Sequence, residues 1–237
     1  MKTVNIVHIY PKEMNIYGDN GNLLVLQNRL LWRKIPVKIT KIGIGQTLPS
    51  DTHLIVGGGG QDAGQTLIAK DLQQKAKTLR QMQKDGIPML MICGMYQMFG
   101  HYFKTHNNEL IPGIGLLDVR TVAGEGRLIG NVVSKTKWGL LVGYENHSGL
   151  TSLGDQATVL GEVPDGQGNN GTDNGEGAYQ FNVFGSYLHG PLLAKSPPLA
   201  DYLLGLVVNL AGYQNKLKPL NDDLEHSAAQ VATSRSR

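Results

Sequence analysis

Residues 87–99 read IPMLMICGMYQMF, an apolar run in which a single cysteine is followed directly by glycine. The first half of the run predicts a buried strand and the second half predicts a helix, so the chain must turn sharply at Cys93. N–H groups at the start of such a helix point back at the sulfur, and the helix dipole favours its thiolate. Cys93 is therefore well placed for nucleophilic attack, although a lone cysteine is more often a small buried hydrophobe.

The sequence before this turn alternates between short apolar strands and helices. Strands are expected at residues 4–9, 37–42, 53–56 and 87–92, and helices at residues 23–32, 66–84 and 95–102. This alternation predicts an α/β fold with a mostly parallel central sheet flanked by helices.

The second half of the chain has a different pattern. Short β-rich runs at residues 116–122, 128–133, 140–144 and 158–163 are expected to form hairpins with mixed pairing, followed by a strand at 179–188 and a closing helix at 198–210. The Gly- and Asn-rich segment 166–177 is expected to be a mobile loop. We predict one domain over residues 1–212 and a polar, disordered tail over residues 213–237.

Composition excludes several classes of protein. The net charge of +3 is small and the Lys and Arg residues are dispersed, so nucleic acid is not an expected partner. One cysteine cannot form an intramolecular disulfide. No stretch approaches the roughly 20 apolar residues that span a bilayer, and the N-terminus lacks signal-peptide features. We expect a cytoplasmic protein without membrane insertion.

Two glycine-rich stretches resemble nucleotide-binding motifs but lack features that these motifs require. Residues 59–66 read GGQDAGQT, which resembles a phosphate-binding P-loop, but Gln65 stands where the lysine belongs. Residues 166–171 read GQGNNG, which fits the dinucleotide pattern, yet no helix is expected after it. Paired cysteines or histidines at zinc spacing are also missing from the sequence. We therefore expect neither a cofactor nor a metal in this chain.

Four segments with useful chemistry are each expected to follow a strand, and such segments can gather at one edge of a parallel sheet. The glycine run in LIVGGGGQ, residues 54–61, and the N–H of Gly94 could hold an oxyanion, although the run could also be only a flexible turn. His189, in FGSYLHGP, could take the proton of the Cys93 thiol. Besides the glycine run, the turn at Cys93 and the segment of His189, the remaining segment is residues 143–149 (GYENHSG), which either contacts substrate or forms a turn.

Together these segments resemble a known family. The motifs ICGMYQ (92–97), GYENH (143–147) and SYLHG (186–190), with the glycine run, resemble class I glutamine amidotransferases of the cobyric acid synthase-like branch. The resemblance covers residues 1 to about 210 and implies their flavodoxin-like fold. The opening YPKEMNIYGDNG, residues 10–21, is similar to glutaminase subunits that serve the amidation of lipid II.

The resemblance implies that Cys93 attacks the side-chain amide of L-glutamine and that His189 shuttles protons, releasing glutamate and ammonia. It further implies that the oxyanion hole is formed by Gly59, Gly60 and Gly94. The substrate-binding residues that it implies are Arg127, Gln97, Asn146 and His147. Arg127 makes physical sense as a bidentate carboxylate clamp, but it could equally be a solvated strand residue.

The sequence departs from the family at two places. Met91 and Met95 flank the nucleophile where many members have glycine. Pro191 stands two residues after His189, at the position where related branches have the glutamate that completes a triad. The expectation is thus a Cys–His dyad, or a third carboxylate supplied by a partner.

The implied partner is a MurT-like subunit of the Mur ligase family, forming a heterodimer and carrying the ATP and Mg²⁺ that this chain lacks a site for. The implied ammonia acceptor is the D-glutamate of lipid II, which becomes D-isoglutamine in peptidoglycan synthesis. Two alternatives stay open: a glutaminase for cobalamin-type side-chain amidation, and a stand-alone cysteine γ-glutamyl hydrolase.

Overall fold

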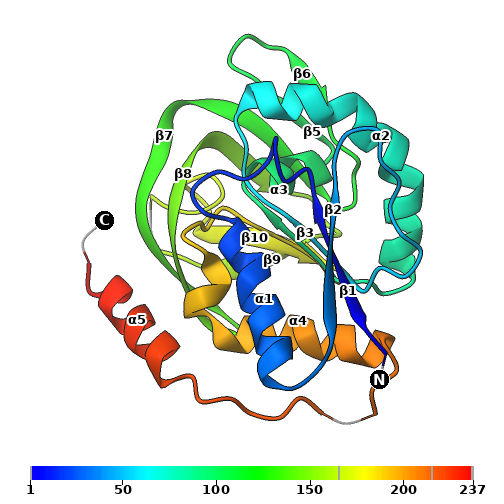
Figure 1. The fold of residues 1–237 in the computed structure, drawn as a ribbon. Coiled ribbons are helices and arrows are strands. Elements are labelled where there is room, and N and C mark those ends of the chain that lie inside the picture. Colours follow the sequence, from blue (N-terminus) through cyan, green and yellow to red (C-terminus); the bar gives the residue numbers. More distant parts are fainter. Residues whose placement is uncertain (1, 165, 215, 236–237) are drawn as a thin grey trace.

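The computed structural model describes residues 2–164, 166–214 and 216–235. A single sheet runs through the molecule, and helices cover its first half (Figure 1). The N-terminal elements are β1 (Val4–Ile9), α1 (Asn20–Trp32), β2 (Val37–Ile42), β3 (Leu54–Gly57), α2 (Asp62–Lys84), β4 (Met89–Ile92) and α3 (Gly94–Phe99). They match the expected strand–helix alternation closely.

The first half of the sheet is parallel, in the order β2-β1-β3-β4-β11, where β11 is Val183–Ser186. Every residue of β1, β3, β4 and β11 is buried. Strands buried on both faces carry near-continuous apolar runs, a pattern that β3 and β4 show and that Asn5 and His8 interrupt in β1. Helix α1 packs against α4 (Pro197–Leu210), whereas α2 packs against α3 (Figure 1). The predicted α/β fold with a mostly parallel central sheet is confirmed.

The remaining strands pair mainly in antiparallel fashion. They are β5 (Tyr102–Lys104), β6 (Leu110–Pro112), β7 (Val119–Thr136), β8 (Gly139–Leu153), β9 (Thr158–Glu162) and β10 (Gly175–Gln180). Strands β7 and β8 form one long hairpin, where the sequence predicted three separate runs. A register break between Ala123 and Leu128, which contains Gly124 and Gly126, separates the first two runs, and Gly139, paired with Thr136, joins the second run to the third.

The glycine-rich segment after β9 is ordered, so the expectation of a mobile loop is wrong. The N–H of Gly168 donates to the buried Glu145 carboxylate at 2.9 Å. Asn169 is fully buried, and its carbonyl accepts a bond from the N–H of Thr151 at 2.8 Å. These bonds fix a polar sequence that has no apolar residues of its own to bury.

The predicted disordered tail contains a helix, α5 (Asp223–Thr233), which lies against η1 (Leu192–Lys195), β7 and β8. The buried guanidinium of Arg29 on α1 holds Asp222, directly before α5, at 2.6 Å. This anchor comes from a distant part of the chain, which is why the tail's polar composition did not reveal it. Residues 215 and 236–237 of the predicted tail lie outside the described residues. None of the helices in the described ranges is long and apolar enough to span a bilayer.

Candidate active site

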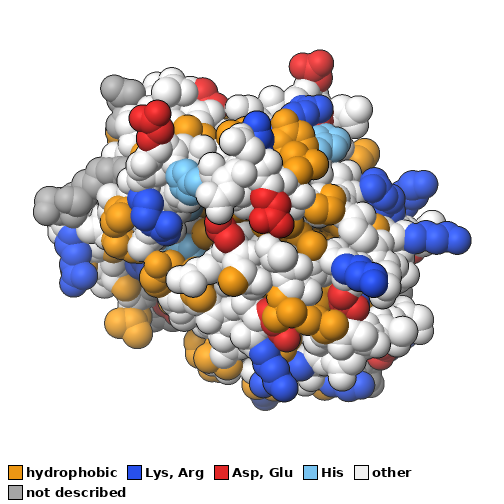
Figure 2. All heavy atoms as spheres, turned by 90° about the horizontal axis from the view of Figure 1, so that it is seen from above, with side chains coloured by type: hydrophobic (Ala, Val, Ile, Leu, Met, Phe, Trp, Pro, Cys, Tyr) orange, Lys and Arg blue, Asp and Glu red, His pale blue; other side chains and the backbone are white. Residues whose placement is uncertain are grey.

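The carboxyl ends of β1, β3, β4 and β11 meet at one edge of the sheet. The loop after β1 brings Asp19, the turn after β3 brings Gly60, the turn after β4 brings Cys93 and Gly94, and the segment after β11 brings His189. We call these five residues the catalytic edge. Figure 2 views the molecule from above, and on this face the Lys and Arg side chains are scattered rather than gathered into one basic patch.

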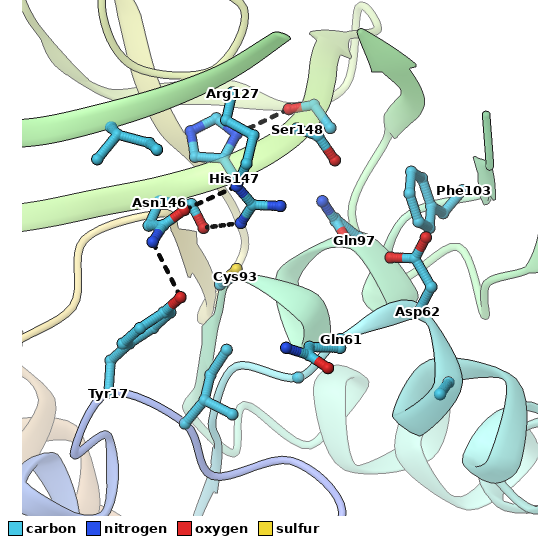
Figure 3. Close-up of a pocket in the computed structure, with 15 residues that line it drawn as sticks. Tyr17, Gln61, Asp62, Cys93, Gln97, Phe103, Arg127, Asn146, His147 and Ser148 are labelled. Carbon is cyan, nitrogen blue, oxygen red and sulfur yellow. Dashed lines mark hydrogen bonds between the residues drawn. The ribbon is translucent and has the colours of Figure 1, made fainter. Parts of the chain in front are cut away.

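Cys93 occupies a strained backbone conformation, with φ +49° and ψ −106°. Non-glycine residues in this region persist only where the surroundings impose it. Here the N–H of Cys93 donates to the carbonyl of Ser186 at 2.8 Å. The carbonyl of Cys93 accepts the N–H of Gln97, a bond in the first turn of α3. The predicted turn from buried strand to helix is confirmed, and it points the sulfur into the pocket (Figure 3).

His189 is almost wholly buried, and its Nδ1–H donates to the Asp19 carboxylate at 2.9 Å. Nε2 has no hydrogen-bond partner among the described residues. Burial lowers the pKa of this imidazole, but the bond to Asp19 and the nearby Cys93 outweigh it and raise the pKa to about 10. At neutral pH His189 is therefore an imidazolium, and Cys93 lies near enough to contribute to its raised pKa.

Asp19 is the third member of the set, and it belongs to this chain. The sequence predicted either a dyad or a carboxylate from a partner; the structure places a carboxylate of this chain on His189, and its catalytic role stays a prediction. The carboxylate is buried and also accepts the N–H of Gly59 at 2.6 Å, so it is held in place. Its one sequence signal is an acid immediately before the helix that follows the first strand, at the same sheet edge as the other segments.

The same contact removes Gly59 from the predicted oxyanion hole, because its N–H already donates to Asp19. Gly60 and Gly94 remain. The backbone N–H of Gly60 has no acceptor within the described residues, and that of Gly94 lies in the first turn of α3, where helical N–H groups lack intrahelical acceptors. A Cβ on Gly94 would come within 2.9 Å of the Gly60 backbone, so only glycine allows this approach.

A cavity of about 470 Å³ opens in front of Cys93. Arg127 and Asn146, from the β7–β8 hairpin, stand on one wall together with Ile129 (Figure 3). We call these three residues the hairpin rim. Arg127 donates through Nε to the Asn146 side chain at 2.9 Å and through Nη2 to its carbonyl at 3.0 Å. Asn146 in turn donates to the Tyr17 hydroxyl at 2.9 Å, which links the rim to the loop after β1.

Gln97 and His147 also line this cavity, and their side chains are bonded within the protein except for Nε2 of His147, which has no hydrogen-bond partner among the described residues. The Gln97 carbonyl accepts a bond from Gln65 at 2.6 Å, and its amide nitrogen donates to the Tyr187 hydroxyl. His147 stacks on the Tyr187 ring with centroids 3.6 Å apart, and its Nδ1 bonds the Gly149 carbonyl. The structure therefore places both residues in the floor of the cavity, where the sequence predicted direct substrate contacts.

Sequence reasoning also missed the acidic side chain among the lining residues of this cavity. Asp62 is the first residue of α2, is exposed, and faces the cavity on a different side from Arg127 (Figure 3). Within the described residues it has no ion-pair partner. The cavity thus has one cationic and one anionic side chain free to act on a zwitterion. A grouping of three His, Cys, Asp or Glu side chains suitable for a metal is absent from the described ranges.

Comparisons with known proteins agree with this geometry. A profile of the CobB/CobQ-like glutamine amidotransferase domain matches residues 5–197. The "Lipid II isoglutaminyl synthase (glutamine-hydrolyzing) subunit GatD" of Staphylococcus aureus strain N315 is 35% identical over 100% of this chain and 97% of its own length. The protein of the same name from Streptococcus pneumoniae strain R6 is 34% identical over 93% of this chain and 86% of its own length.

Among solved structures, PurLQS from Thermotoga maritima superposes with a TM-score of 0.58, covering 88% of this chain and 99% of that chain at 16% identity. At this identity the likeness concerns the fold alone. The predicted class I glutamine amidotransferase fold is confirmed.

Proposed function

Since the chain belongs to the CobB/CobQ-like glutamine amidotransferase family, we propose that it hydrolyses L-glutamine to glutamate and ammonia for use by a second subunit. The observation that carries the proposal is the buried Asp19–His189–Cys93 arrangement, in which Cys93 lines a cavity of about 470 Å³. Its three side chains come from three separate loops and supply a nucleophile, a proton carrier and a carboxylate that orients the proton carrier.

In the first half-reaction the Cys93 thiolate attacks the side-chain carbonyl carbon of glutamine. The N–H groups of Gly60 and Gly94 stabilise the oxyanion that forms. The C–N bond then breaks as His189 donates its Nε2 proton to the amide nitrogen, and ammonia leaves. Asp19 does not touch the substrate; it is a positioning residue that fixes the ring and stabilises its positive charge.

In the second half-reaction the now neutral His189 takes a proton from water, and the hydroxide attacks the γ-glutamyl thioester. Collapse of this intermediate releases glutamate and restores the thiolate and imidazolium. The buried setting keeps the positions of these groups fixed throughout, so little reorganisation is needed as charge develops.

Recognition of glutamine falls to charges at the mouth of the cavity. Arg127 would bind the α-carboxylate through the part of its guanidinium that Asn146 leaves free, and Asp62 would bind the α-ammonium. Asn146 accepts two hydrogen bonds from Arg127 and is itself held by the Tyr17 hydroxyl, so the guanidinium is fixed in position.

The consumer of the ammonia, in this proposal, is a MurT-like subunit of the Mur ligase family in a heterodimer with this chain. That subunit would bind ATP and Mg²⁺ and activate the D-glutamate of lipid II, giving D-isoglutamine in the cytoplasm. Support comes from the two relatives, whose shared name describes a glutamine-hydrolysing subunit of a lipid II isoglutaminyl synthase.

The test has two stages. The purified chain is assayed for release of glutamate from glutamine, with Cys93→Ala as the variant, and is treated with a glutamine-derived diazoketone that alkylates thiolates. We expect turnover and labelling of the wild type, and neither in Cys93→Ala. With the Mur ligase-like subunit, ATP and lipid II added, amidated lipid II should form. Turnover that persists in Cys93→Ala would refute the mechanism, and failure of amidation alone would refute the acceptor.

A further inference from the structure

A second cavity, of about 500 Å³, touches His189 without including Cys93. One wall comes from Tyr144 on β8 and from Gly190 and Lys195, and helix α5 forms the other wall. Helix α5 lies at the edge of the molecule (Figure 1), where it contacts η1, β7 and β8. The active site is therefore bordered by two hollows, and the proposed glutamine pocket accounts for only one of them.

Helix α5 turns its apolar side toward this second cavity. Leu224, Ala228, Val231 and Ala232 all line it and are spaced for one helical face. Such a face normally packs against the protein, yet no residue of α5 is buried, and Leu224 and Val231 are 79% and 54% exposed. The helix is nonetheless held in position by the Arg29–Asp222 ion pair at its start. The apolar face is thus presented over an open space.

Lys195 and Arg235 line this cavity, and none of its lining residues in the described ranges is acidic. Lys195 donates to the Gly190 carbonyl at 2.6 Å, and the described residues offer it no acidic partner. Partial burial lowers its pKa, as expected for an ammonium group without a nearby anion. Arg235, just beyond α5, lines the same cavity and makes no ion pair within the described residues. Charge complementarity therefore calls for an acidic side chain in the occupant.

We propose that the space between α5 and the β7–β8 hairpin is the docking groove for the ammonia-consuming subunit, which inserts an apolar segment bearing a carboxylate that pairs with Lys195. This inference rests on the proposed function and specifies where the two subunits meet. Docking there would bury the apolar face of α5 and bring the partner against the segment that carries His189. The partner would then lie next to the bond-breaking step that releases ammonia.

The experiment compares two neighbouring residues of α5 that differ only in the direction they face. Val231→Asp places a charge on the cavity side, and Gln230→Asp places the same charge on a residue that does not line the cavity. Neither residue is buried, so both variants should fold, which thermal unfolding checks. Binding to the purified Mur ligase-like subunit is measured by calorimetry, and hydrogen exchange of residues 223–233 is followed with and without that subunit.

We expect Val231→Asp to weaken binding by about tenfold or more and Gln230→Asp by less than about twofold, since hot spots lie in the desolvated centre of an interface. Exchange in α5 should slow in the wild-type complex. If the complex forms but both variants bind equally, or if α5 exchange is unchanged, the docking groove is refuted while the proposed function stands. If wild-type chain and ligase subunit do not associate, the proposed partnership fails and this inference fails with it. Self-association of the wild-type chain that Val231→Asp abolishes would instead assign the groove to a second copy.

Discussion

Cys93 and Gly60 of the catalytic edge line the same cavity as the hairpin rim, but the two regions are built in opposite ways. In the catalytic edge His189 is 1% exposed, Asp19 2% and Cys93 5%, and all three follow buried strands. In the hairpin rim Ile129 is 47% exposed, and Arg127 extends from an irregular stretch of β7. Burial strengthens electrostatic interactions and fixes geometry, whereas an open rim lets substrate enter. We infer that substitutions in the edge act on kcat and substitutions in the rim act on KM.

The largest loss of activity is expected from Asp19→Asn, a substitution in the catalytic edge. The amide keeps the shape of the carboxylate but cannot stabilise the His189 imidazolium, so kcat should fall by about 10²- to 10⁴-fold with KM nearly unchanged. Steady-state glutamine hydrolysis measures both constants. The exposed residue Asp155, changed to Asn in the same way, should behave as wild type. A loss below about tenfold would favour a Cys–His dyad in which Asp19 is only structural.

The same variant should change the pH profile. In the wild type the raised pKa of His189 keeps the ring protonated until the pH approaches about 10. Without the Asp19 charge this pKa must fall, so the alkaline decline of kcat/KM should begin at lower pH. A purely structural role for Asp19 would lower activity by the same factor at every pH.

The edge and the rim also differ in how far the sequence predicts them. Cys93, Gly94 and His189 could be located because a strand end followed by glycine or a helix is a local pattern. Asp19 could not be paired with His189, since 170 positions separate them and only tertiary packing joins the two. The use of the Gly59 N–H by Asp19 was hidden for the same reason. Helix α5 depends on Arg29, which is equally remote in the sequence.

The next effect tests the rim. Arg127→Lys keeps the positive charge but loses the planar fork that can bind a carboxylate through two parallel bonds. We expect KM for glutamine to rise by about 10- to 100-fold, with kcat changed by less than about threefold. Arg120→Lys is the matched control, because Arg120 lies on the same strand and does not line the cavity. A fall in kcat without a rise in KM would break the division between edge and rim.

A smaller effect is expected across the cavity from the rim. Asp62→Asn should raise KM for glutamine by about tenfold by removing the partner of the α-ammonium. The analogue glutaramate lacks that ammonium, so its hydrolysis should hardly change, and the preference for glutamine should shrink accordingly. Asp85→Asn, at the other end of α2, serves as the control. An unchanged preference between the two substrates would exclude Asp62 from recognition.

The smallest effect on activity concerns Glu176 on β10, which supports the catalytic edge from behind. One carboxylate oxygen accepts the N–H of Tyr187 at 2.8 Å and the hydroxyl of Ser186 at 2.9 Å. The carbonyl of Ser186 in turn accepts the N–H of Cys93. The buried Glu176 side chain therefore fixes Ser186 and Tyr187, which connect the backbone of Cys93 to the segment that carries His189. Complete burial raises the pKa of Glu176 to about 7, and the nearby Glu145 adds to the shift.

This raised pKa makes Glu176 a source of pH-dependent stability whose sign is fixed. Between pH 4.5 and 7 the unfolded chain has lost the Glu176 proton while the folded chain still holds it. The free energy of unfolding must therefore fall as pH rises through this window, by about 3 kcal/mol at most. Glu176→Gln keeps an oxygen for Ser186 and Tyr187 but cannot ionise, so kcat should stay within about threefold of wild type while this pH-dependent loss disappears. Denaturant unfolding at pH 5 and pH 8 measures the difference. An identical pH dependence in both proteins would mean that Glu176 is already ionised in the folded state at pH 5, and the edge would then rest on a buried charge rather than on a neutral acid.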